Sequence, residues 1–248
     1  MKVIQSIQND IIKNIDKLND KKTRINKQKF IVEGYHLVEE AYNHSLLEAI
    51  LTTKEVDFKK YSNVDQYLVN EQIIKKLSST VNPQGIIGIV KMPKVLPLDL
   101  TKKDIKIVLL ESINDPGNLG SIIRTAAALG YDAVYMSSDT VDIYNEKALR
   151  ATQGAIFKIP FYYGSLIDVV KTLKQNGIKC IGTNLKKSIS IDDFVKEKKF
   201  SICFGNEARG MSEELSNMMD VNVKIPMENK VESLNVLSAS SIVMYTLK

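Results

Sequence analysis

The second half of the chain alternates short apolar runs with amphipathic segments. Five runs rich in aliphatic and β-branched residues predict buried strands at residues 106–110, 133–136, 178–183, 200–204 and 221–225. The segments between them predict helices at residues 118–129, 145–152, 166–176 and 213–218, with a last helix from about Ser233. Gly130 and Gly177 follow two of these helices, where a left-handed cap favours glycine. This pattern predicts an α/β fold with a parallel sheet covered on both faces.

The first half predicts a smaller α/β domain. Aliphatic residues from Ile4 to Leu18 recur every three or four positions, which predicts an amphipathic helix over residues 3–18. We expect the basic stretch after this helix to be a loop. Strands are predicted at residues 30–32, 49–52, 67–69 and 86–90, with helices at 36–43 and 71–78. Two prolines in residues 91–97 indicate a linker. We therefore expect a first domain at 1–92, a linker at 93–104 and a second domain at 105–248.

The charge of the chain is concentrated near its N-terminus. The net charge is +5, and residues 13–29 hold seven lysines and arginines against two aspartates, which equals the whole excess. Such a segment can neutralise phosphates of a nucleic acid. A solvated charged surface accounts for the charge equally well.

Several classes of protein are disfavoured by composition. The longest apolar runs fall far short of the ~18 residues that cross a bilayer, and the N-terminus lacks an apolar signal block, so we expect a soluble, cytoplasmic protein without membrane contact. Cys180 and Cys203 lie inside apolar runs, which predicts reduced core thiols. His36 and His44 are the only histidines and lie in the first half, which argues against a histidine triad in the second domain and against a metal site.

Two common nucleotide-binding motifs are absent. Residues 205–212 have the glycine spacing of a phosphate-binding P-loop, but Met211 occupies the position where that loop needs lysine. No Gly-x-Gly-x-x-Gly fingerprint of a dinucleotide site occurs.

Three polar segments follow predicted strands, at residues 114–124, 204–210 and 225–235. Carboxyl ends of strands are where open α/β sheets bind ligands, so we expect the site of chemistry there. Asn118 is well placed as a helix N-cap, and Arg124 lies six residues on among apolar neighbours, either in the site or as a surface charge. Gly205 permits either close approach of a ligand to the main chain or a tight turn.

These segments resemble, in order, motifs one, two and three of the SpoU (TrmH-type) family of RNA 2′-O-ribose methyltransferases, part of the SPOUT superfamily. The resemblance covers residues 105–248 and rests on Asn114–Arg124, Phe204–Gly210, and Ile225–Met227 leading to Glu232–Asn235. The first half is similar to the substrate-binding domain often fused to these enzymes, through residues 30–34, 77–80 and 83–86.

The resemblance implies a cofactor site for S-adenosylmethionine in a C-terminal region that forms a deep trefoil knot, with the last helix threaded through a loop. The family's cofactor contacts fall on Thr183, Gly205, Ile225 and Leu234. Backbone groups at strand ends can read adenine edges, while Ile225 and Leu234 can cover its faces.

The family's catalytic set falls on Asn118, Arg124, Glu207, Ser233 and Asn235. Because arginine keeps its proton, we expect Arg124 to clamp the adjacent phosphate and stabilise the developing alkoxide, and the general base stays open. We expect Glu207 to orient Arg124 through a bidentate pair, and Asn118 and Asn235 to shape loops by bonds to backbone. Ser233 can contact either the cofactor or the hydroxyl.

The resemblance also concerns RNA and oligomeric state. Members are homodimers, with Arg124 expected near the subunit interface. Arg150 lies in a further matching segment, where it is either an RNA contact or a helix-surface charge. Lys21, Lys22, Arg24 and Lys27 are the expected RNA-binding residues of the first domain. The chain departs from the family at Leu237 and Ser238, a bulkier pair than expected, which we expect to affect packing of the last helix.

The sequence therefore predicts an S-adenosylmethionine-dependent enzyme that methylates a ribose 2′-hydroxyl of structured RNA, with ribosomal RNA favoured over tRNA. A non-catalytic RNA-binding or ribosome-assembly factor is the alternative, which the complete catalytic set disfavours. A nucleotide-phosphate binder using residues 205–210 is a third hypothesis, and it predicts a preference for ATP over S-adenosylmethionine.

Overall fold

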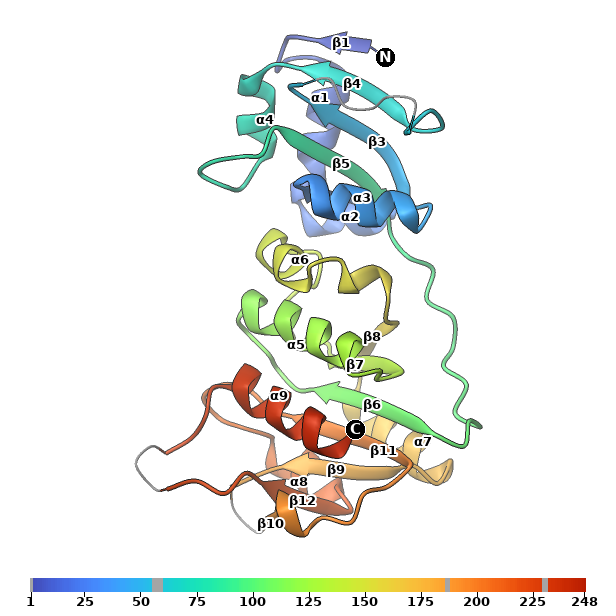
Figure 1. The fold of residues 1–248 in the computed structure, drawn as a ribbon, viewed down its shortest axis with the longest axis vertical. Coiled ribbons are helices and arrows are strands. Elements are labelled where there is room, and N and C mark those ends of the chain that lie inside the picture. Colours follow the sequence, from blue (N-terminus) through green and yellow to red (C-terminus); the bar gives the residue numbers. More distant parts are fainter. Residues whose placement is uncertain (1, 55–59, 186–187, 229–231) are drawn as a thin grey trace. The chain divides into compact units, whose positions relative to one another are not determined.

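The computed structural model describes residues 2–54, 60–185, 188–228 and 232–248, and it divides into two compact units (Figure 1). Unit 1 comprises residues 1–94 and unit 2 residues 95–248. Each unit has its own sheet, and residues 92–104 form neither helix nor strand.

Unit 1 is built on a mixed five-stranded sheet in the order β1-β4-β3-β5-β2. Its strands are β1 (Lys2–Ile4), β2 (Lys29–Glu33), β3 (Leu47–Thr52), β4 (Asp65–Val69) and β5 (Ile86–Lys91). Its helices are α1 (Asp10–Asp16), the 3₁₀ turn η1 (Lys17–Asn19), α2 (Lys21–Lys27), α3 (Tyr35–Asn43) and α4 (Glu71–Leu77). β1, β4 and β3 run parallel, whereas β5 is antiparallel to both of its neighbours.

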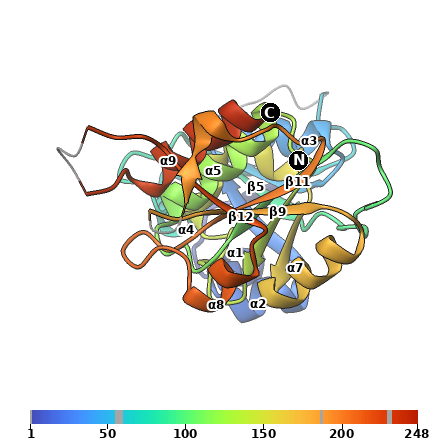
Figure 2. The same ribbon diagram turned by 90° about the horizontal axis from the view of Figure 1, so that it is seen from below.

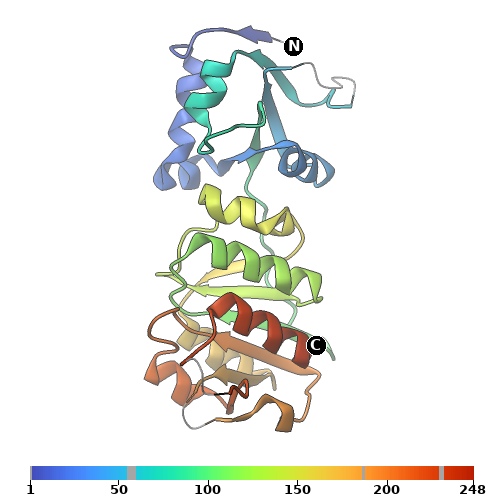
Figure 3. The same cartoon turned by 60° about the vertical axis from the view of Figure 1, so that its left-hand side comes forward.

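Helices cover both faces of this sheet. Ile12 and Ile15 of α1 and Ile73 of α4 lie in one apolar cluster with the strands. Helix α3 packs on the other face, where Gly88 lets it approach, since a Cβ at Gly88 would lie 3.1 Å from a methyl of Val38. Figure 3 shows α3 on the opposite side of the strands from α1 and α4.

The predicted helix over residues 3–18 is only partly right, since only Asp10–Asp16 and the turn after it are helical, and the predicted basic loop is wrong. Residues 2–4 form an edge strand, and α1 begins only after Asn9, whose side chain accepts the N–H of Ile11 at 2.9 Å. The basic stretch is helical because Asp20 caps α2, accepting the N–H of Thr23 at 2.7 Å. Asn9 interrupts an apolar periodicity from Ile4 to Leu18 that predicts one continuous helix, and Asp20 starts a second helix after it.

Unit 2 is built on a seven-stranded sheet in the order β10-β12-β9-β11-β6-β7-β8, with every described pairing parallel. Its strands are β6 (Ile105–Leu110), β7 (Ala133–Ser137), β8 (Phe161–Gly164), β9 (Lys179–Thr183), β10 (Ile189–Ser190), β11 (Lys199–Phe204) and β12 (Val221–Lys224). The predicted α/β class with a parallel sheet is confirmed. The two edge strands β8 and β10 were not predicted.

The helices of unit 2 are α5 (Pro116–Ala128), α6 (Glu146–Thr152), α7 (Leu166–Gln175), α8 (Glu213–Met218) and α9 (Val236–Leu247), with 3₁₀ turns η2 (Ala155–Phe157) and η3 (Ile191–Asp193). Figure 2 shows α5 and α9 on one side of the strands and α7 and α8 on the other. Gly130 and Gly177 have φ of +72° and +69°, as their positions after α5 and α7 predict. Cys180 and Cys203 are free, buried thiols, also as predicted.

Helices α5 and α6 pack unusually closely. A Cβ at Gly120 would lie 2.3 Å from the carbonyl oxygen of Ala148 and 2.7 Å from the Cβ of Ala151, so only glycine fits there. Helix α9 packs on the other side of α5, where the hydroxyl of Tyr131 donates to the carbonyl of Met244 at 3.1 Å. Threading of α9 through a loop stays a prediction, since part of the segment before it, residues 229–231, lies outside the described residues. Among the described helices, none has the length and apolar character to cross a bilayer.

Candidate active site

The carboxyl ends of four neighbouring strands place the three polar segments on one edge of the sheet. β12, β9, β11 and β6 are adjacent and parallel, so the segments that follow them emerge on the same side. The segments after β6, β11 and β12 contain the three motifs, and the predicted cofactor residue Thr183 ends β9. The sheet topology therefore brings the three motifs together at the carboxyl ends of the strands, where the site was expected.

Glu207 joins the first two motifs. Its carboxylate accepts hydrogen bonds from the N–H of Asn114 at 3.2 Å, the N–H of Asp115 at 3.1 Å and the side-chain amide of Asn118 at 3.2 Å. Partial burial alone raises the pKa of Glu207, but these hydrogen bonds outweigh it, and the pKa lies below its ordinary value. Glu207 is thus held as an anion against the N-terminus of α5, where the helix dipole favours negative charge.

Asn118 is not the N-cap of α5. The cap is Asp115, which accepts the N–H of Asn118 at 2.8 Å, and Pro116 occupies the first helical position. Lys147 of α6 pairs with Asp115 at 2.7 Å, and this bond, followed by the Asn118 N–H, lowers the pKa of Asp115. Asn118 lies in the first turn, with its side chain turned to Glu207 and not to backbone.

Asn206 fixes the loop after β11. Its amide donates to the carbonyl of Ser112 at 2.7 Å, while its oxygen accepts the N–H groups of Ala208 and Arg209 at 3.0 and 3.1 Å. Asn206 and Gly210 also exchange backbone hydrogen bonds of 3.0 and 2.9 Å. Only 7% of the Asn206 surface is exposed, so its hydrogen bonds are protected from water.

Gly205 is required by this turn. A Cβ at Gly205 would lie 2.1 Å from both the Gly210 carbonyl carbon and the Met211 nitrogen. Of the two readings of Gly205, the structure supports the tight turn directly. A role in cofactor contact stays a prediction.

The sequence reasoning missed three residues that hold this edge together: Asn206, Asp115 and Glu111. Glu111 follows β6 and accepts both the N–H and the hydroxyl of Ser212, at 2.8 and 2.6 Å. A proline directly after Asp115 was an available signal for the true cap. Asn206 and Glu111 have no such local signal, because their partners are 94 and 101 residues away.

Arg124 projects from the second half of α5 and is exposed. The expected bidentate pair with Glu207 is wrong, because the Glu207 oxygens are taken by Asn114, Asp115 and Asn118. Within the described part of the chain, the Arg124 guanidinium makes no hydrogen bond or ion pair. It is available for a partner outside this chain.

The third motif leads into α9. Asn235 caps this helix by accepting the N–H of Leu237 at 2.8 Å, which confirms the expectation that Asn235 shapes its loop through backbone. Ser233 is exposed, and Leu234 and Ile225 are half-buried. Thr183 donates from its hydroxyl to the carbonyl of Cys203 at 2.8 Å, which ties β9 to β11. Incompletely covered aliphatic side chains beside strand ends fit the apolar face of an adenine ring.

The predicted RNA-binding residues of unit 1 differ in exposure. Lys21, Lys22 and Lys27 are exposed on α2, but Arg24 is only 9% exposed. Its guanidinium donates to the carbonyls of Leu18 and Asn19 at 3.0 and 2.7 Å, so its position indicates a structural role.

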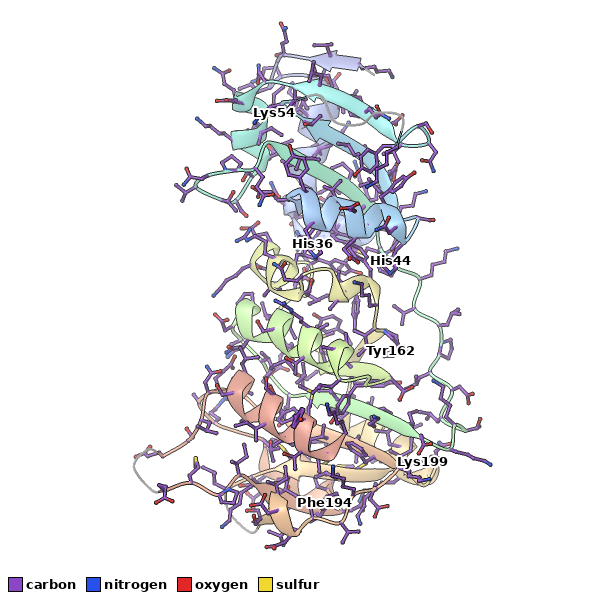
Figure 4. The ribbon with its side chains drawn as sticks, viewed as in Figure 1. His36, His44, Lys54, Tyr162, Phe194 and Lys199 are labelled. Atoms are coloured by element: carbon purple, nitrogen blue, oxygen red, sulfur yellow. The ribbon has the colours of Figure 1, made fainter. Side chains whose placement is uncertain are left out.

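Arg150 and the two histidines complete the set of residues that the sequence analysis considered. Arg150 on α6 is half-buried. Both histidines belong to α3 and its C-cap in unit 1, as Figure 4 shows. No described group of three His, Cys, Asp or Glu side chains is arranged to hold a metal ion.

Known structures share this architecture along nearly the whole chain. The AdoMet-bound rRNA methyltransferase from Sinorhizobium meliloti superposes with a TM-score of 0.89 at 28% identity, covering 99% of this chain and 97% of that one. A crystal structure described as an RNA 2′-O ribose methyltransferase superposes with a TM-score of 0.86 at 26% identity, covering 99% and 97%. The fold and the motif-bearing edge define a SPOUT-type RNA methyltransferase.

Sequence comparison gives the family. Residues 106–245 match the SpoU rRNA Methylase family, and residues 9–88 match the MRM3-like substrate binding domain. The 23S rRNA (guanosine(2553)-2′-O)-methyltransferase RlmP of Bacillus subtilis (strain 168) is 34% identical over 251 residues, covering 100% of both chains. The chain belongs to the SpoU rRNA Methylase family. The predicted family, RNA 2′-O-ribose methyltransferase activity and S-adenosylmethionine cofactor are confirmed.

Proposed function

We propose that this enzyme methylates a ribose 2′-hydroxyl of 23S ribosomal RNA in the cytoplasm. The full-length similarity to RlmP supports this substrate over tRNA. The observation that carries the proposed site is the bonding of Glu207 to three groups of the first motif, which makes two separate motifs one rigid edge beside the exposed Arg124.

In the reaction, the ribose 2′-oxygen would form a bond to the methyl carbon while the bond between that carbon and sulfur breaks. The electron pair of the broken bond would stay on sulfur, and the hydroxyl proton would be released. The bound cofactor supplies the methyl group. Arg124 binds the adjacent phosphate and stabilises the negative charge that develops on the ribose oxygen. Asn118, Glu207 and Asn235 hold the loops, and Ser233 contacts the cofactor or the hydroxyl. Thr183, Gly205, Ile225 and Leu234 line the cofactor site.

Transfer to isolated RNA tests this proposal. Labelled S-adenosylmethionine is incubated with the full chain and 23S rRNA that lacks its own modification, and the label is mapped by resistance to alkali. Ribose methylation blocks the 2′-hydroxyl that alkali cleavage needs, so one resistant linkage is expected. A methylated base, or transfer to tRNA and not to 23S rRNA, would contradict the proposal. Tight RNA binding without transfer would support the non-catalytic alternative.

Discrimination between cofactors tests the third hypothesis. Calorimetry on the full chain should give binding of S-adenosylmethionine or its demethylated product, with little heat from ATP. The opposite preference would favour a nucleotide-phosphate binder on residues 205–210.

A homodimer is also part of this proposal. Ile242 and Tyr245 lie one turn apart on α9 with 43% and 63% of their surface exposed, and α9 packs against the helix that carries Arg124. Exposed apolar side chains of this size on a helix favour association with a second copy. Sedimentation should give a dimer that Tyr245→Asp dissociates. Val195→Asp is the matched control, since Val195 is 78% exposed on a different segment and should leave the dimer intact.

A further inference from the structure

The loop after β11 carries a second arginine that the family resemblance did not assign. Arg209 lies two residues after Glu207 and is exposed. Its backbone N–H is fixed by Asn206, but within the described residues its guanidinium makes no hydrogen bond or ion pair. It therefore combines a fixed backbone with a cation that is free to bind a ligand.

Three lysines of unit 2 already hold the fold through hydrogen bonds or ion pairs. Lys147 pairs with Asp115 and Lys174 with Asp220, both at 2.7 Å. Lys199, labelled in Figure 4, donates to the carbonyls of Leu100 and Asn176 at 3.3 and 3.2 Å. Arg209 differs from these lysines because no structural task accounts for its charge.

Hydrogen bonds from three segments hold the base of the Arg209 loop. Asn206 bonds to the carbonyl of Ser112, a non-glycine residue held at a φ of +55°. Ser112 is kept in this conformation by its N–H to the Ser137 hydroxyl at 2.8 Å and by its own hydroxyl to Asp139 at 2.5 Å. These bonds connect the loops after β6, β7 and β11.

The electrostatics of Asp139 indicate where the Arg209 charge lies. Hydrogen bonds from Ser112 and then Ser137 lower the pKa of Asp139, and the positive charge of Arg209 adds to this effect. Arg209 therefore lies over the same strand ends as Ser112 and on the same edge as Glu207. Because hydrogen bonds already hold the loop backbone, binding of a phosphate by Arg209 costs little backbone entropy, and only the side chain has to be ordered.

We propose that the Arg209 guanidinium binds a backbone phosphate of the RNA substrate beside the nucleotide that is methylated. This inference rests on the proposed function. Arg209 acts in substrate binding, distinct from Arg124, which acts on the reacting ribose. Arg209 presents the planar fork that matches two phosphate oxygens.

The test measures RNA binding and turnover with 23S rRNA transcribed in vitro. Arg209→Ala should raise the KM for this RNA about 5- to 10-fold, change kcat less than about twofold, and reduce the slope of log affinity against log salt by about 0.7 to 1. Arg209→Lys should restore the slope because the charge is retained, but only part of the affinity. Lys171→Ala, which removes an exposed charge from α7 on the other face of the sheet, should behave as wild type.

The outcomes separate the two proposals. If wild type transfers no methyl group to the transcript, the proposed substrate fails, whatever Arg209 does. If wild type is active and Arg209→Ala keeps its KM and salt slope, the role of Arg209 fails alone. A large loss of kcat at unchanged KM would also overturn it, because Arg209 would then act in the chemistry. Binding of S-adenosylmethionine and the thermal midpoint should be unchanged in both Arg209 variants, since the Arg209 guanidinium makes no hydrogen bond or ion pair with the described residues.

Discussion

The two units use polar side chains in different ways. In unit 2, polar residues gather at one edge of a parallel sheet, where Glu207, Asn206 and Glu111 each bond to a segment some 90 or more residues away. In unit 1, the comparable bonds seal one loop, with Glu33 accepting the hydroxyls of Ser78 and Thr80. The contrast fits the proposal that unit 2 carries the chemistry and that the exposed lysines of unit 1 bind the RNA.

Arg124→Ala should have the largest effect on this contrast, because it should remove most of the methyl transfer that we assign to unit 2. Loss of one preorganised group that stabilises developing charge typically costs 10²- to 10³-fold in rate. We expect transfer to fall by about 10³-fold, with the affinity for S-adenosylmethionine within about threefold of wild type. Single-turnover transfer and calorimetry measure the two quantities. A large loss of cofactor binding would mean that Arg124 has another role.

Gly205→Ala tests whether the turn after β11 tolerates a larger residue. Its new Cβ would overlap the backbone of Gly210 and Met211, so we expect a loss of about 3 kcal/mol in the free energy of unfolding of unit 2. Gly130→Ala is the matched control, since Gly130 has a φ of +72° but open space around its Cα, and should cost about 1 kcal/mol. Urea denaturation of the full chain measures both. Equal losses would show that crowding at Gly205 is unimportant.

Arg24 and Lys22 separate structure from RNA binding within unit 1. Arg24→Ala leaves the buried carbonyl of Leu18 and the part-buried carbonyl of Asn19 without their donor, and it should lower the stability of unit 1 by about 2 kcal/mol. Lys22→Ala should change stability by less than about 0.5 kcal/mol, yet reduce the salt dependence of rRNA binding by about 0.7 to 1 in slope. Thermal unfolding and salt titrations distinguish them. The reverse pattern would return Arg24 to the RNA-binding set.

The pH dependence of unit 2 gives the smallest expected effect. Because the folded state lowers the pKa of Glu207 below its ordinary value of 4.5, ionised Glu207 stabilises the fold above that value, and this contribution is lost as the pH falls through the folded pKa. Between about pH 6 and about pH 3, wild type should lose more unfolding free energy than Glu207→Gln. Parallel curves for the two proteins would show that the Glu207 charge is not coupled to folding.

Much of the fold followed from local pattern. The central strands of unit 2 are apolar on both faces, so they stand out as short runs rich in aliphatic and β-branched residues between amphipathic segments, and α8 begins and ends where it was predicted. The edge strand β8 was missed because Phe161–Gly164 is short and has exposed positions. The start of the N-terminal helix was misjudged because Asn9 acts as a cap inside an apolar repeat, and α2 was missed because Asp20 caps a helix within the basic stretch.

The candidate site was predictable only as far as its motifs. The resemblance of its motifs to those of the SpoU family pointed to Asn118, Arg124, Glu207 and Asn235, but not to what each contacts. The Glu207 carboxylate holds the start of α5, a pairing that depends on β6 and β11 being adjacent. Likewise, Asn206 needs the carbonyl of Ser112 in its left-handed conformation, which is set by Ser137 and Asp139 on a third loop.

The glycine at position 120 has a mechanical consequence. With Ala148 and Ala151 pressed against its backbone, α5 cannot slide or tilt without carrying α6 along. We therefore expect a displacement of α6, which carries Arg150, to move α5 and Arg124 with it, whereas an added methyl group at position 120 would force the two helices apart.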